Sequence, residues 1–170
     1  MTDPVPLDLG HDIHLIDTGY IRPRHTASYL VVGDGQAAFV ETGTPRSTEL
    51  LLTALAKLSL DVADVKYVIV THVHLDHASG AGALLERLPN AELVTHPRGA
   101  RHMIDPSKLV AGAAAVYGES FMRTNYGRVV GVPSDRVIEA VEGLTLDLGG
   151  RPLSFLHTPG HAKHHLCVHD

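Results

Sequence analysis

A cluster of three histidines and one aspartate directly behind a short apolar run restricts the possible folds more than any other feature. The run is VKYVIV, residues 65–70, and the cluster is THVHLDH, residues 71–77. A nearly continuous apolar run of this length is typical of a central strand that is covered on both faces. Because functional groups of α/β sheets gather beyond the carboxyl ends of the strands, we expect a site at this position.

The residue types in the cluster are those that bind metal ions. Imidazole and carboxylate groups are ligands of Zn²⁺ and also of iron and manganese. In extended backbone His72 and His74 project together, and Asp76 shares their side if the extension persists. His77 reaches the same cavity from another direction, because the chain turns into a helix there. This geometry predicts two adjacent metal pockets. The alternative is a polar loop in which Asp76 caps the next helix, but the density of ligand-type residues favours the metal site.

The remainder of the chain alternates between strand and helix patterns, which gives an α/β or α+β class. In the first part we expect strands over 12–19 and 26–33, a hairpin over 31–43 that turns at Asp34-Gly35, and a helix from Ser47, the N-cap, to Leu58, with Pro45 just outside it. Further along we expect a helix over 78–88, a strand over 91–96, helical pieces over 97–130 broken at Pro106, a hairpin over 144–158 that turns at Gly149-Gly150, and a last strand after residue 161.

Length and composition fit one globular domain. A chain of 170 residues is long enough to bury a core. Its net charge of −5 argues against a nucleic-acid-binding face. Its only cysteine, Cys167, allows no disulfide within the chain, and no apolar stretch approaches membrane-spanning length. The first ten residues lack the basic and apolar regions of a signal peptide. We therefore expect a cytoplasmic protein that acts on a small molecule.

Two histidine motifs together resemble those of the metallo-β-lactamase-fold hydrolase superfamily. The HxHxDH signature is present as His72, His74, Asp76 and His77. The TPGH segment, residues 158–161, places His161 where the family has its next metal-ligand histidine. The segment SYLVVGDGQAAFVETGT resembles the family's N-terminal hairpin, with Glu41 in place of an aspartate. The resemblance covers the whole chain, and within the superfamily it favours the glyoxalase II-like branch.

The resemblance implies an α+β fold, the αββα sandwich, with a dinuclear zinc centre, or iron or manganese in its place. It implies that His72, His74 and His161 bind the first ion. Asp76 and His77 would bind the second. A metal-bound hydroxide would attack a small ester-like bond, a thioester or a lactone, and Asp76 would orient it as the catalytic residue. One alternative is a mononuclear iron dioxygenase of the same fold, similar to persulfide dioxygenases. Another is an inactive fragment that binds metal or a partner.

Two ligands of the family pattern are not found, namely a bridging aspartate and a histidine near the C-terminus. Asp170 follows His161 by nine positions (170 − 161), too few for the intervening strands, and we interpret it as a turn residue. We therefore expect residues 1–170 to form a single, incomplete domain from the N-terminal part of a longer protein. Its exposed apolar faces predict association with a second copy or with the missing C-terminal half.

Several residues near the motifs have other expected roles. Glu41 is expected to support the metal loop through backbone hydrogen bonds. His157, at a strand end, is interpreted as a structural group or a support for a ligand. For His164 and His165 two roles stay open, either a residue that hydrogen-bonds a ligand or lines the pocket, or a polar strand edge. The basic residues of the segment 96–109 are interpreted as a solvated helix face, with contact to an anionic substrate as the alternative.

Overall fold

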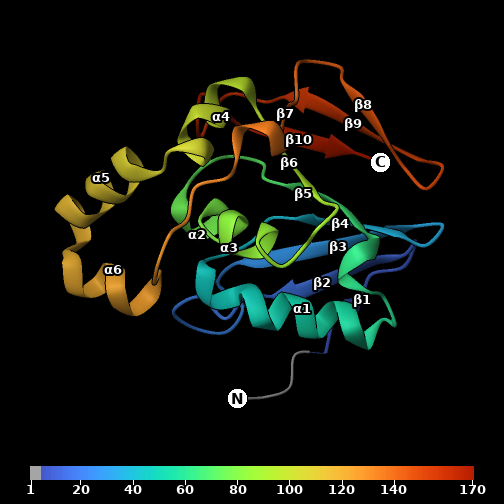
Figure 1. Cartoon of the computed structure of the whole chain (residues 1–170), viewed down its shortest axis with the longest axis horizontal. Coiled ribbons are helices and arrows are strands. Elements are labelled where there is room, and N and C mark those ends of the chain that lie inside the picture. Colours follow the sequence, from blue (N-terminus) through green and yellow to red (C-terminus); the bar gives the residue numbers. More distant parts are fainter. Residues whose placement is uncertain (1–4) are drawn as a thin grey trace.

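Two β-sheets and a set of flanking helices make up the protein in the computed structural model, which describes residues 5–170 (Figure 1). The larger sheet has the strand order β1-β2-β3-β4-β5-β6-β7, and the smaller sheet has the order β10-β9-β8. The strands are β1 (Leu7–Asp8), β2 (Ile13–Asp17), β3 (Ala27–Gly33), β4 (Gln36–Val40), β5 (Val65–Ile69), β6 (Glu92–Thr95), β7 (Val137–Glu139), β8 (Thr145–Leu148), β9 (Arg151–His157) and β10 (Leu166–His169). The helices are η1 (Pro45–Ser47), α1 (Thr48–Lys57), η2 (Val62–Asp64), α2 (Leu75–Ala78), α3 (Ala81–Leu85), α4 (Pro97–Ile104), α5 (Ser107–Tyr117), α6 (Glu119–Asn125) and η3 (Ser134–Arg136).

The larger sheet changes from antiparallel to parallel pairing at β4. Strands β1 to β4 form antiparallel neighbours, and β4 to β7 are parallel. The β3–β4 hairpin turns at Asp34-Gly35, as predicted, and both residues have positive φ (32° and 76°). Asp and Gly tolerate this conformation and so favour the two-residue turn. The β8–β9 hairpin turns at Gly149-Gly150, which confirms the second predicted turn.

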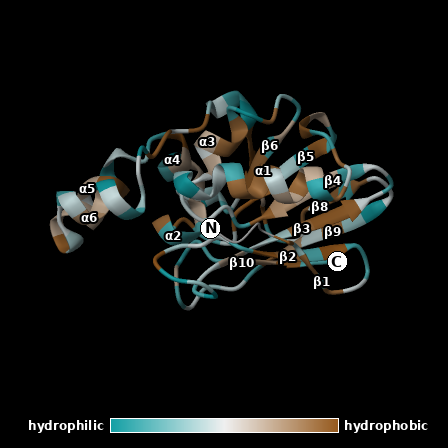
Figure 2. Ribbon diagram, turned by 90° about the horizontal axis from the view of Figure 1, so that it is seen from below, coloured by the Kyte–Doolittle hydropathy of each residue, from teal (hydrophilic) through white to brown (hydrophobic). Residues whose placement is uncertain are grey.

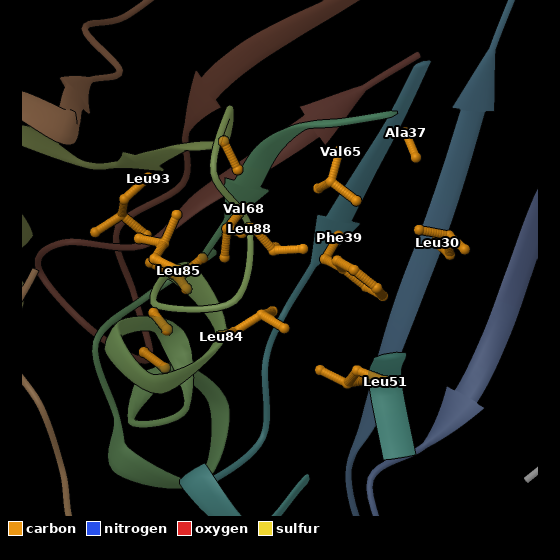
Figure 3. Close-up of a cluster of buried hydrophobic side chains, with 14 of the residues drawn as sticks. Leu30, Ala37, Phe39, Leu51, Val65, Val68, Leu84, Leu85, Leu88 and Leu93 are labelled. Atoms are coloured by element: carbon orange, nitrogen blue, oxygen red, sulfur yellow. The ribbon is translucent and has the colours of Figure 1, made fainter. Parts of the chain in front are cut away.

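Strand β5 lies inside the molecule and is covered on both faces, as its apolar sequence predicted. On one face Val65 and Val68 pack with residues of α1 and α3, among them Leu51 and Leu84 (Figure 3). On the other face Tyr67 and Ile69 belong to a second core that includes Leu153 and Phe155 of the smaller sheet. The layers are therefore helices, large sheet and small sheet. This arrangement confirms the α+β class and corresponds to part of an αββα sandwich.

The two sheets meet closely at one end of β3. A Cβ atom on Gly33 would lie 2.0 Å from the carbonyl oxygen of Leu148, so only glycine fits there. Arg151 strengthens the same contact, because its guanidinium group donates to the carbonyl oxygens of Val32 (3.0 Å) and His11 (2.7 Å). The hairpin of the small sheet is thus fixed against the end of the large sheet.

The predicted helix over 78–88 is wrong in detail, because the chain forms two short helices, α2 and α3, in that region. The break lies at Gly80, where a Cβ atom would stand 2.9 Å from the carbonyl oxygens of Thr42 and Thr44. Close packing against this loop thus bends the chain between the two helices. Ser47 does occupy the N-cap of α1, but its hydroxyl does not cap that helix. It donates to the carbonyl oxygen of Thr18 and accepts the backbone N–H of Thr44 (3.4 Å), as part of the capping box of η1. Pro45 lies within η1.

Helices α4, α5 and α6 follow β6, and the chain between α4 and α5 breaks at Pro106, as predicted. Helices α5 and α6 project from the body of the molecule in two perpendicular views (Figures 1 and 2). None of the residues of α5 is buried. Strand β7 was not predicted from the sequence. Among the described residues, no helix combines the length and apolar character needed to cross a bilayer.

Candidate metal centre

The histidine cluster lies where β5 ends and α2 begins. His72 follows the strand and is buried, and His74 occupies the N-cap of α2 with extended backbone. His161 comes from the loop between β9 and β10. The backbone N–H of Leu166 donates to the carbonyl oxygen of Thr71 (2.9 Å), so the start of β10 is tied to the loop that follows β5. Two segments that are about ninety positions apart in the chain (161 − 72) therefore meet at one place.

His72, His74 and His161 point one ring nitrogen each toward a common point. These three nitrogens lie within 4.8 Å of one another. Nδ1 of His74 is 3.0 Å from Nε2 of His161. The ring of His72 stands nearly perpendicular to the other two rings, with centroid distances of 4.6 and 5.0 Å. The structure thus brings together the three histidines that the sequence motifs had singled out. His72, His74 and His161 form the histidine triad of the site.

The chemical state of His72 fits a metal ligand. Its Nδ1 lies 2.9 Å from Oγ1 of Thr71, while its Nε2 is buried and has no hydrogen-bond partner among residues 5–170. Burial, together with the neighbouring imidazoles, lowers the pKa of His72 to about 3. Burial also lowers the pKa of His74. Both rings are therefore neutral at pH 7, and a buried nitrogen without a partner is costly unless a cation or another group satisfies it. A set of neutral imidazoles suits Zn²⁺.

His77 lies between two carboxylates beside this cluster. Its Nδ1 donates to Oε2 of Glu41 (3.0 Å), and its Nε2 is 3.4 Å from Oδ2 of Asp76. The hydrogen bond to Glu41 raises the pKa of His77. Asp76 contacts His77 in this way, yet among the described residues it belongs to neither group that is close enough to share an ion. The structure therefore places Asp76 and His77 together, as expected, at the edge of the triad.

Glu41 has a larger part in the site than its sequence position indicated. It forms a second possible ligand group with His72 and His77, with one atom of each within 4.8 Å. Its Oε1 also accepts the backbone N–H of Thr71 (2.7 Å), which is the support of the metal loop expected from the sequence. Since both oxygens already accept hydrogen bonds, we interpret Glu41 as the residue that orients His77. The contact with His77 was not foreseen.

His157 and Asp170 lie outside both groups. The ring of His157 packs on that of His96 (4.1 Å between centroids), and its Nε2 donates to the carbonyl oxygen of Ala140 (2.8 Å). These contacts agree with the structural role expected for His157. Asp170 pairs with Arg151 at the end of β10. Within residues 5–170, neither residue belongs to a ligand group with His72, His74 or His161.

The two histidines whose roles stayed open both line the site. Nδ1 of His164 accepts the backbone N–H of Val73 (3.4 Å), and its ring lies 6.0 Å from the ring of His74. His165 contacts Oγ1 of Thr158 (2.8 Å) and its ring lies 5.4 Å from that of His72. Both histidines are thus neighbours of the triad.

A pair of buried tyrosines adds a feature that sequence reasoning missed. The hydroxyl of Tyr20 donates to the hydroxyl of Tyr126 (2.7 Å). Burial raises the pKa of both residues, and the negative charge of Asp76 adds to the effect. Two un-ionised phenols therefore lie near Asp76. No local pattern connects residues 106 positions apart in the chain, so only the fold reveals this pair.

Comparisons with known proteins agree with this geometry. The sequence profile described as the metallo-beta-lactamase superfamily matches residues 21–170. A metallo-beta-lactamase fold-containing protein of Sulfurisphaera tokodaii is 27% identical over 161 residues, which is 92% of this chain and 58% of that protein. An N-acyl homoserine lactonase of Azorhizobium caulinodans is 28% identical over 120 residues, which covers 71% of this chain and 41% of the lactonase. A hydroxyacylglutathione hydrolase of a Synechococcus strain is 29% identical over 125 residues, 74% of this chain and 36% of that hydrolase.

Solved structures show the same fold. A subclass B3 metallo-beta-lactamase from a soil metagenome superposes with a TM-score of 0.72 at 19% identity, over 96% of this chain and 56% of the other. At this identity the likeness concerns the fold alone. The chain spans between about a third and about three fifths of the length of the three curated relatives.

Proposed function

The chain belongs to the metallo-β-lactamase superfamily, and from this premise we propose that it carries the centre of a metal-dependent hydrolase that cleaves a small ester-like bond. A thioester or a lactone is the proposed bond. The observation that carries the proposal is the buried Nε2 of His72, which has no partner among residues 5–170. One ring nitrogen of His72 lies within 4.8 Å of ring nitrogens of His74 and His161.

In this proposal His72, His74 and His161 hold the first ion, while Asp76 and His77 contribute to a second one. Zinc is the proposed metal, because a neutral imidazole set suits it. When bound, such an ion lowers the pKa of a coordinated water to about 7 and polarises the carbonyl group of the substrate.

The side chains of the protein orient the attacking water and the ligands, and they determine which nitrogens carry protons. Asp76 accepts a hydrogen bond from the attacking water and fixes its orientation. Glu41 holds the Nδ1 proton of His77, so the Nε2 lone pair of His77 faces the side of Asp76. Burial keeps His72 neutral and therefore available as a ligand well below neutral pH. The relatives that are named a lactonase and a hydroxyacylglutathione hydrolase support an ester-like or thioester substrate.

Elemental analysis and a hydrolysis assay test the proposal together. We expect zinc in the purified protein and zinc-dependent cleavage of at least one compound in a panel of thioesters and lactones. The His72→Ala variant should lose the metal and the activity. His169→Ala is the matched control, because His169 is exposed in β10 and outside both ligand groups.

Other results would contradict the proposal in recognisable ways. One iron per chain with oxygen-dependent turnover would favour the dioxygenase alternative. Metal binding with no cleavage of any compound would favour a fragment that binds metal or a partner without turnover. The predicted association of the chain with a second copy or with a further segment is tested separately, by light scattering.

A further inference from the structure

A basic pocket lies beside the histidine triad. Its walls come from the start of α4 and from the loop after His161, and its lining residues are Pro97, Arg98, Arg101, His102, Lys163 and His164. The pocket is open to solvent and has a volume of about 550 Å³. No carboxylate is among these lining residues. The arrangement is unusual in a chain whose net charge is −5.

The three permanent charges of the pocket have no acidic partner among the described residues. Within residues 5–170, none of the ion pairs includes Arg98, Arg101 or Lys163. Arg98 and Arg101 are three positions apart on α4, a spacing that places them on one face of the helix. Lys163 belongs to a different segment and faces the same cavity. Three like charges held together without a counterion repel one another, so an anion bound among them would be favoured.

The positive charges of the pocket also affect the pKa values of nearby histidines. Burial lowers the pKa of His102, and the charges of Arg101 and Lys108 lower it further. Burial also lowers the pKa of His96, with His157 and Arg98 as the other causes. In the part of the chain that the structure describes, no carboxylate is among the causes of either shift. These imidazoles are neutral at pH 7, so the charge of the pocket comes from the two arginines and the lysine.

The position of His164 connects the pocket to the triad. Its ring lines the pocket and lies 6.0 Å from the ring of His74. We propose that Arg98, Arg101 and Lys163 form a binding site for an anionic group, carboxylate or phosphate, on the part of the substrate that does not react. This inference rests on the proposed hydrolase function for the identity of the ligand as a substrate. It deepens that function by selecting acidic thioesters over neutral esters and lactones.

The chemistry of the three side chains fits this ligand class. Guanidinium groups bind carboxylates and phosphates through paired N–H donors, and an ammonium group adds a flexible point charge. A substrate whose reacting bond lies at the triad would thus extend its acidic group past His164 toward α4. Arg98, Arg101 and Lys163 are substrate-binding residues in this scheme and take no part in bond cleavage.

A binding experiment tests the pocket without reference to activity. Metal-free His72→Ala protein is titrated with inorganic phosphate and, separately, with succinate, and binding is followed by isothermal titration calorimetry and through the backbone NMR signals of α4. We expect saturable shifts of Arg98 and Arg101 that weaken at high salt. In the same background the R98Q/R101Q double variant and the K163Q variant should each bind at least about tenfold more weakly. Preference for phosphate or for succinate indicates which acidic group the site recognises.

The R87Q variant is the control for a general loss of positive charge. Arg87 is exposed, pairs with Glu49 and precedes β6, at the opposite end of that strand from His96. Its replacement should leave anion binding unchanged. Equal weakening in R87Q and R98Q/R101Q, or no weakening in either, would overturn the inference.

A kinetic experiment connects the pocket to the substrate. The zinc-loaded protein is assayed with one acyl group carried on glutathione, on coenzyme A and on neutral N-acetylcysteamine. In R98Q/R101Q we expect KM to rise at least about tenfold for the recognised acidic thioester and to stay constant for the neutral one. An equal change for the acidic and neutral thioesters would contradict the inference. If the wild-type protein cleaves neither these thioesters nor any lactone of the panel, the proposed function fails, and the phosphate and succinate titrations still decide whether the pocket binds anions.

Discussion

Glu41 holds His77 by a hydrogen bond of 3.0 Å and thereby connects the end of β4 to the start of α2. Its second oxygen accepts the backbone N–H of Thr71, so one buried side chain orients both the loop and the imidazole. Glu41 itself has φ of 68°, a left-handed conformation that costs energy for a residue with a side chain. The surrounding hydrogen bonds maintain that conformation where the side chain is needed.

The first prediction concerns this hydrogen bond. In Glu41→Gln the amide oxygen can still accept the Thr71 N–H, but the charge opposite His77 is lost. We expect the affinity for the second metal ion to fall by about 10- to 100-fold, as is typical for loss of a residue that supports a ligand. Competition with a chelator measures the affinity. Glu49→Gln, at an exposed ion pair, should have no effect. Equal affinities in wild type and Glu41→Gln would contradict the orienting role.

Local sequence patterns predicted the parts of this site that depend on neighbours in the chain. The apolar run over β5 and the histidine spacing behind it located the end of a central strand, and the Asp34-Gly35 turn followed from backbone preference alone. The contact between Glu41 and His77 spans 36 positions, and no local rule reports it. The break at Gly80 has the same origin, because only the packing of the 42–44 loop determines it.

The family resemblance predicted more of the site than residue spacing did. It predicted that His161 lies with His72 and His74, although 89 positions separate His161 from His72 (161 − 72). The basic segment 96–109 shows the opposite case. Its pattern fits a solvated helix face, and only the fold shows that Lys163 completes a pocket with Arg98 and Arg101.

The second prediction tests the contact between the two sheets. In Gly33→Ala the new methyl group would collide with the carbonyl oxygen of Leu148, a backbone atom that cannot rotate away. We expect the free energy of unfolding to fall by about 1–3 kcal/mol, as for other overpacked sites. Gly112→Ala is the control, since the corresponding position in α5 has open space around it. That change should raise stability by up to about 1 kcal/mol. Urea unfolding of both variants measures the difference.

The third prediction concerns the pH dependence of stability through His96. Its Nδ1 accepts the backbone N–H of Arg98 (2.9 Å), and a protonated nitrogen cannot accept. Burial first, and then His157 and Arg98, hold the pKa of His96 below its ordinary value of 6.5. At pH values between 6.5 and the lowered pKa of His96, the unfolded chain binds more protons than the folded one. Acidification below pH 6.5 therefore lowers the free energy of unfolding, by at most about 1.4 kcal/mol per pH unit for this group.

His96→Asn isolates this contribution. An asparagine oxygen can accept the same N–H at the start of α4, and it does not titrate. The loss of stability between pH 7 and pH 5 should therefore be smaller in His96→Asn than in wild type. Urea unfolding at several pH values measures both slopes. Parallel slopes would mean that His96 does not contribute.

The fourth prediction uses metal binding itself as a stabilising force. His161 belongs to the β9–β10 loop and His72 to the loop after β5, so an ion bound by both would link two segments that unfolding separates. An ion that binds only the folded state raises the free energy of unfolding by about 2.7 kcal/mol at a concentration 100 times its Kd. We expect this gain with zinc in wild type and in His169→Ala, and its loss on addition of a chelator. In His161→Ala the metal-free protein should retain its stability, because His161 is exposed, while the gain with zinc should largely disappear. An unchanged zinc effect in His161→Ala would show that the ion is held elsewhere.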